Sequence, residues 1–158
     1  MNHETPLQVL RRHPFVKGLQ EHEIEQLGTL AREVRYERGH VLFGEGEEST
    51  QFYLIVSGSV ALEIAPPSGV FIVDTLAAGD EFGWSSVMGQ GTVYQARALS
   101  DMDVLAFDAA ELRALCEADK AFGYELMRRL LGVVSDRLQV TRLHLMDTYW
   151  PVARKAGA

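Results

Sequence analysis

The chain has 158 residues, of which 47% are hydrophobic and 23% are charged, and its formal net charge is −7. A chain of this length and composition is typical of one globular domain with a buried core, and no apolar run approaches the about 20 residues that cross a bilayer. The acidic balance argues against nucleic acid as a partner, because phosphate contacts need a basic surface. The N-terminus lacks the apolar segment of a signal peptide, and Cys116, the single cysteine, excludes an internal disulfide. We therefore expect a cytoplasmic protein that does not bind a membrane.

Residues 1–33 carry two short helical patterns, which the segment HPFVKGL separates. In the second pattern Ile24, Leu27 and Leu30 or Ala31 recur at intervals of three to four residues, as on one face of an amphipathic helix. The sequence therefore predicts N-terminal helices within residues 1–33.

Residues 34–108 consist of short β-type runs that turns separate. Nine of the fourteen glycines lie between Gly39 and Gly91, and glycine supplies the positive φ angles that tight strand connections require. Val60 and Leu62 alternate with smaller or charged neighbours, as in a half-buried strand. Many short strands with frequent turns predict a mainly β fold with flanking helices, here a jelly-roll-like β-roll.

Residues 109–147 again have the sequence pattern of helices. They follow Asp108, whose side chain is suited to cap a helix N-terminus. A long helix is predicted from about Ala121 to Asp147, and residues 148–158 form a tail. No internal repeat interrupts the chain, so we expect one domain over residues 1–158.

The long helix carries an apolar stripe whose members are spaced by three and four residues in turn. Its members are Tyr124, Met127, Leu131, Val134, Leu138, Thr141 and Leu145. Spacing of this kind keeps one seam in line over several turns and favours a homodimer along the helix. The alternative is a helix that packs this stripe on its own β-roll.

Three segments and their order resemble the cyclic nucleotide-binding domain family, and in particular the effector domain of catabolite-activator-type regulators. They read GEGEESTQFYLIVSGSV, LAAGDEFGWSS and ARALSDMDVLAFD, and the long helix adds RLQVT. The resemblance implies a β-roll that binds a cyclic nucleotide or another small anion, with no catalytic function and no further cofactor. In the family's transcription regulators a DNA-binding domain follows, and this sequence ends where that domain would begin, so DNA binding is not expected.

The resemblance assigns the cyclic phosphate to a glycine turn and the short helix after it, here Phe82, Gly83, Ser85 and Ser86. Backbone N–H groups at a helix N-terminus attract anions. Trp84 stands where the family has a ribose-binding glutamate, and an indole cannot accept a hydrogen bond.

The family's phosphate-binding arginine aligns with Thr92, beside Val93, and neither side chain is charged. Arg97 aligns with a residue that points outward, so it is not expected to replace this arginine. Losing both ionised groups predicts that an ordinary cyclic nucleotide binds at least about a hundredfold more weakly than in the family.

Three further residues shape the expected pocket. Thr141 matches a long-helix threonine that contacts the base in the family, although a small polar residue also occurs in helix seams without such a role. Trp84 and Tyr94 could stack on a flat ligand or fill and close the pocket. The five histidines show no metal-binding spacing.

Two hypotheses follow for the function. The first is a non-catalytic sensor with a pocket formed by Phe82, Gly83, Trp84, Ser85, Ser86, Thr92, Val93, Tyr94 and Thr141. The second is a ligand-free adaptor that recruits an unidentified protein through its β-roll or its helical dimer.

Overall fold

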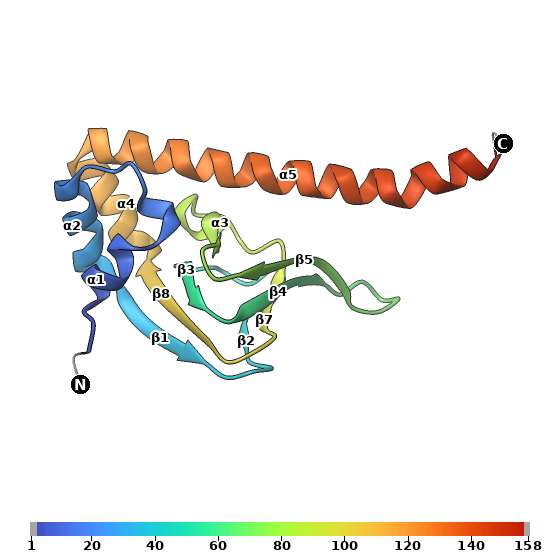
Figure 1. The fold of residues 1–158 in the computed structure, drawn as a ribbon, viewed down its shortest axis with the longest axis horizontal. Helices are drawn as coiled ribbons and strands as arrows, with labels where there is room; N and C mark the ends of the chain where they lie inside the picture. The colour runs from blue at the N-terminus through green and yellow to red at the C-terminus, as the bar shows by residue number, and fades with distance from the viewer. Residues whose placement is uncertain (1–2, 157–158) are drawn as a thin grey trace.

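The computed structural model describes the backbone of residues 3–156 and the side chains of residues 3–147. Helices gather at one end of a β-roll, and the longest helix runs along the roll and past it (Figure 1). The helical segments are α1 (Pro6–Arg11), the 3₁₀ turn η1 (Pro14–Val16), α2 (Glu21–Leu30), α3 (Trp84–Val87), α4 (Ala109–Ala118) and α5 (Lys120–Ala156). The strands are β1 (Arg32–Tyr36), β2 (Val41–Phe43), β3 (Gln51–Ser57), β4 (Ser59–Ile64), β5 (Phe71–Ala77), β6 (Glu81–Phe82), β7 (Gln95–Ala98) and β8 (Met102–Asp108).

The roll consists of two antiparallel sheets of four strands each, in the orders β1-β8-β3-β6 and β2-β7-β4-β5. This architecture confirms the predicted jelly-roll-like β-roll with flanking helices. The sharp corner between β3 and β4 depends on Gly58, which has φ +84°. A Cβ atom there would lie 2.4 Å from the carbonyl oxygen of Asp101, so no other residue fits.

Successive side chains along a strand point to opposite faces of the sheet, so the core has two parts. Tyr53 and Ile55 of β3 face the interior of the roll, where Val60, Leu62, Phe82 and Val104 join them. Phe52 and Leu54 of the same strand point the other way, and they pack with Leu10, Leu27, Leu112 and Phe122 of the helices. One sheet therefore carries the helical layer on its outer face and closes the roll with its inner face.

The first half of α5 packs on the helical layer through Phe122, Leu126, Leu130 and Val133. The helix continues to Ala156, beyond the predicted end at Asp147, so most of the predicted tail is helical. Residues 157–158 of that tail lie outside the described residues. None of the helices in the described part of the chain is both long and apolar enough to cross a membrane.

The predicted seam is only partly separate from the core-packing face of α5. Four of its residues are mostly exposed: Tyr124 (71%), Leu131 (69%), Leu138 (67%) and Leu145 (54%). They are spaced by seven residues, whereas Met127 between them packs partly against the helical core. The stripe is therefore divided between an exposed part and a half-buried part that includes Met127 and Val134, and the dimer along the helix stays a prediction.

His13 fixes η1 to strand β3. Its Nε2 lies 3.0 Å from the carbonyl oxygen of Ile55, and its Nδ1 accepts a hydrogen bond of 3.1 Å from the N–H of Phe15. This pair of contacts requires the neutral ring protonated on Nε2. Burial lowers the pKa of His13, and the opposing influence of Asp80 is smaller.

We predict that the free energy of unfolding falls as the pH decreases from 7.5 to 5.5. The folded-state pKa of His13 lies below its ordinary value of 6.5, so below that pH the unfolded chain binds more protons and stability is lost. Urea denaturation should show a shallower pH dependence in His13→Gln, because one histidine contributes at most about 1.4 kcal/mol per pH unit. Carboxyl groups titrate alike in both proteins, so identical slopes would contradict this role of His13.

Candidate functional site

The predicted anion-binding turn is formed by β6, Gly83 and α3. Gly83 has φ +84° and ψ +20°, and a Cβ atom at this position would lie 2.7 Å from the carbonyl oxygen of Gln51. Glycine is therefore required for the chain to pass β3 and enter α3. Within the single turn of α3 the N–H of Ser86 donates to the carbonyl oxygen of Gly83 at 3.1 Å, so this N–H is already used by the turn.

The two serines of α3 lie on different sides of the helix. Ser85 lines the cavity in front of the turn, as predicted. The hydroxyl of Ser86 is buried and donates to the carbonyl oxygen of Gly83 at 2.6 Å. Ser86 instead borders a separate cavity behind α3, where Arg113 donates to its carbonyl oxygen at 2.7 Å. Ser86, which was predicted to form one pocket with Ser85, therefore does not line the cavity that Ser85 lines.

Two small cavities occupy the predicted site. The first, of about 20 Å³, is lined by Phe43, Leu62, Phe82, Gly83, Trp84, Ser85, Thr92, Val93, Tyr94 and Arg137. The second, of about 10 Å³, is lined by Leu62, Val73, Asp74, Tyr94, Arg137, Val140 and Thr141. Binding sites for small organic molecules usually measure about 300–1,000 Å³. The structure therefore brings all of the predicted pocket residues except Ser86 together around these two cavities.

Aromatic side chains close much of this space. Phe82 is buried and stacks on Tyr53, with ring centroids 4.7 Å apart. Trp84 borders the first cavity and also packs against the helical core, which links α3 to that layer. Tyr94 borders both cavities. Trp84 and Tyr94 are both half-buried beside cavities smaller than a flat ligand needs, which agrees with the interpretation that they fill the pocket.

Thr92, which stands in place of the family's arginine, is buried and used by the fold. Its hydroxyl lies 2.6 Å from the carbonyl oxygen of Gly44 and 3.1 Å from that of Glu47. Its N–H donates to the same carbonyl of Glu47 at 2.9 Å. Thr92 therefore fixes the β2–β3 loop beside the cavity, whereas its neighbour Val93 is exposed.

Arg97 points away from the cavities. Its Nε lies 3.0 Å from Oε1 of Glu63, whose side chain is buried, and Gln95 donates to the same oxygen at 3.1 Å. Ala96 and Ala98, on either side of Arg97, are buried in the interior of the roll. The outward orientation expected for Arg97 is confirmed.

Arg137 of α5 is the site residue that sequence analysis missed. Its side chain is only 13% exposed and borders both cavities. Nη1 donates to Oδ2 of Asp74 at 3.3 Å, and Nη2 donates to the carbonyl oxygen of Glu81. Arg137 lies one helical turn before Thr141, on the same face of α5, and this spacing was the signal in the sequence that could have found it.

Some polar groups around Arg137 have hydrogen-bond partners and others do not. Its Nε is buried and has no hydrogen-bond partner in the described structure. Burial raises the pKa of the Glu81 carboxyl, and the positive charge of Arg137 opposes this change. Thr141 borders the second cavity, while its hydroxyl donates to the carbonyl oxygen of Arg137 at 3.0 Å.

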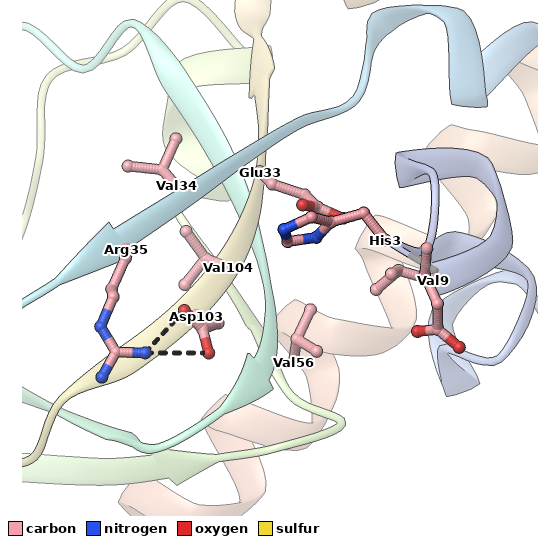
Figure 2. A pocket seen from close by; sticks show the side chains of 9 residues that line it. His3, Val9, Glu33, Val34, Arg35, Val56, Asp103 and Val104 are labelled. Carbon is pink, nitrogen blue, oxygen red and sulfur yellow. Dashed lines mark hydrogen bonds and ion pairs between the residues drawn. The ribbon is translucent and has the colours of Figure 1, made fainter. Parts of the chain in front are cut away.

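Larger hollows lie elsewhere on the molecule. Figure 2 shows one of about 470 Å³ between the N-terminal segment and the outer face of the sheet, where Arg35 reaches Asp103. The guanidinium of Arg35 is exposed and also lies near Asp101, so its charge is neutralised in open solvent. No three His, Cys, Asp or Glu side chains in the described structure lie close enough together to share a metal ion.

We predict that Thr92→Val lowers the free energy of unfolding by about 1–2 kcal/mol, because valine has the same shape but cannot donate to the loop carbonyls. Thr75→Val is the matched control, since Thr75 is exposed on β5. Chemical denaturation of both variants measures the difference. Equal stability of the two variants would show that the hydroxyl of Thr92 does not hold the loop.

Comparisons with known proteins agree with this architecture. The family model of the cyclic nucleotide-binding domain matches residues 33–119, which contain strands β2–β8 with α3 and α4. A candidate cyclic nucleotide-binding protein from Geobacter metallireducens has a crystal structure that matches with a TM-score of 0.75 at 26% identity, and the match covers 86% of this chain and 99% of that one.

Two curated relatives are regulators. A CRP-like cAMP-activated global transcriptional regulator of Mycobacterium tuberculosis is 28% identical over 142 residues, which are 89% of this chain and 62% of the relative. A cAMP-dependent protein kinase regulatory subunit of Mycosarcoma maydis is 29% identical over 114 residues, which are 72% of this chain and 19% of the relative. The chain thus spans less than two thirds of the length of these relatives, and its matched segment shows that it belongs to the cyclic nucleotide-binding domain family.

Proposed function

We propose that the protein is a non-catalytic regulatory domain that senses a small anionic molecule and binds an ordinary cyclic nucleotide only weakly. The observation that carries this proposal is the glycine turn at Gly83, which presents α3 to a cavity that α5 closes. The relatives named above are regulators, which supports a regulatory role rather than a catalytic one. The cytoplasmic location and the single domain over residues 1–158 stay predictions.

The weak affinity for cyclic nucleotides follows from the two departures at the turn. Trp84 offers no acceptor for a ribose hydroxyl, and its ring is held between the cavity and the helical core. Thr92 has no charge, and its hydroxyl already donates to the carbonyl oxygen of Gly44 in the β2–β3 loop. The neutral side chains at these two positions remove the groups that select a cyclic nucleotide in the family.

The response would be transmitted through α5, because this helix borders the site and also exposes the seam. Arg137 and Val140 lie against the second cavity, and Thr141 of the seam also borders it, while the seam residues Leu131 and Leu138 are exposed. A ligand that binds one arrangement of α5 better than another would shift the balance between them. We propose that the partner of the seam is a second copy of this chain, since a strict seven-residue spacing suits an identical helix.

A ligand-free adaptor is the second candidate function. The closed cavities favour it, as does an exposed apolar segment on the β4–β5 hairpin that consists of Val70, Phe71 and Ile72. Contiguous exposed apolar side chains mark surfaces that bind other proteins. In this function the hairpin or the seam would recruit a protein partner.

We predict that at least one of a panel of anions raises the melting temperature by several degrees at millimolar concentration. The panel contains cyclic AMP, cyclic GMP, inorganic phosphate and benzoate, and sodium chloride of equal ionic strength is the control. Ligand at a hundred times its Kd stabilises the folded state by about 2.7 kcal/mol. Saturation by micromolar cyclic AMP would contradict the weakened site, and a panel without any shift would favour the adaptor.

We predict that light scattering gives about twice the chain mass of 17.6 kDa at micromolar concentration. Leu131→Glu should give the monomer mass, because it places a carboxylate in the apolar seam. Leu143→Glu is the matched control, since Leu143 is exposed on the face opposite the seam. A monomeric wild-type chain, or equal masses of both variants, would contradict the proposed dimer.

A further inference from the structure

An anion in the closed site needs a positive charge that the glycine turn alone does not supply. Thr92 and Val93 are neutral, and Arg97 is paired with Glu63 on the outer face of the sheet. Arg137 is the one cationic side chain among the described residues that line the two cavities. It enters the site from α5, more than forty residues along the chain from the turn.

The guanidinium of Arg137 donates to two groups of the roll, but one of its N–H groups has no hydrogen-bond partner. Asp74 of β5 accepts from Nη1 at 3.3 Å, and the carbonyl oxygen of Glu81 of β6 accepts from Nη2. The Nε–H is buried without a partner. A buried donor of this kind is costly, and a ligand oxygen that reached it would remove the cost.

We propose that Arg137 binds the anionic group of the ligand, and that its bridge to Asp74 keeps the empty site closed until the anion takes the place of that carboxylate. This inference rests on the proposed sensing function and names the residue that provides its charge selectivity. A carboxylate or phosphate oxygen that accepts from Nη1 takes the place of Asp74, and a charge-assisted contact of this kind is stronger than one between neutral groups.

Asp74 is suited to release Arg137. Its Oδ1 accepts a hydrogen bond of 2.9 Å from the N–H of Thr75, so the carboxylate keeps a backbone partner after the exchange. Its side chain is 23% exposed, which allows water to replace the guanidinium. The bridge is therefore an exchangeable contact between α5 and the roll.

The surroundings of Arg137 also indicate the class of ligand. Leu62 and Tyr94 border both cavities, and Phe43 borders the first. A ligand that opens this space would place an apolar or aromatic body against these side chains and its anionic group at Arg137. We expect organic carboxylates or phosphate esters with a flat apolar part to bind better than inorganic phosphate.

Calorimetric titration with cyclic AMP, benzoate and inorganic phosphate tests the exchange in four proteins: wild type, Arg137→Gln, Asp74→Asn and Arg97→Gln. Arg137→Gln should weaken binding of each anion about tenfold or more, because one charge-assisted contact is lost. Asp74→Asn should strengthen it, because the competing carboxylate is removed. Arg97→Gln removes the same charge outside the site and should bind as wild type does.

Circular dichroism spectra and melting temperatures establish that each variant is folded. Arg137→Lys keeps the charge but lacks the forked geometry of the guanidinium, so it should recover part of the affinity that Arg137→Gln loses. Equal binding by wild type and Arg137→Gln would overturn this inference and leave the sensing function intact. Absence of binding in wild type together with binding by Asp74→Asn would support the closed bridge. Absence of binding in both would overturn the inference and the proposed function together.

Discussion

The contact between Arg137 and the roll connects α5, which carries the seam, to the strands that border the proposed site. The first half of α5 is held by apolar packing through Leu126, Leu130 and Val133, but beyond them the helix crosses the opening of the roll. There a guanidinium bridges Asp74 of β5 and the carbonyl oxygen of Glu81 of β6. A polar bridge of this kind can exchange partners without loss of the core, whereas apolar packing cannot.

The glycine turn and the side chains around it are under different physical constraints. Close passage of the chain over β3 requires glycine at position 83, so the path into α3 is fixed by sterics. The side chains at positions 84 and 92 carry no such constraint, and Trp84 and Thr92 serve packing and loop attachment instead. The backbone of a family site can therefore persist while its ligand-selecting groups differ.

The presence of short strands could be predicted because alternation and glycine turns are local signals, as in β4, where Val60 and Leu62 alternate with smaller or charged neighbours. Strand β6 has only two residues, too few for a pattern, and the end of α5 has no glycine or proline stop at Asp147. Arg137 was missed because its contact with Asp74 spans 63 residues and depends on how α5 crosses the roll. Ser86 was misplaced because the side of a one-turn helix cannot be derived from spacing alone.

A double-mutant cycle between Asp74 and Arg137 measures the central contact directly. Chemical denaturation of Asp74→Asn, Arg137→Gln and the double variant gives the coupling in the free energy of unfolding, and a partly buried charged pair predicts at least about 1 kcal/mol. A coupling of this size supports the bridge between α5 and the roll. A coupling near zero would contradict it, because the two side chains would then contribute to stability independently.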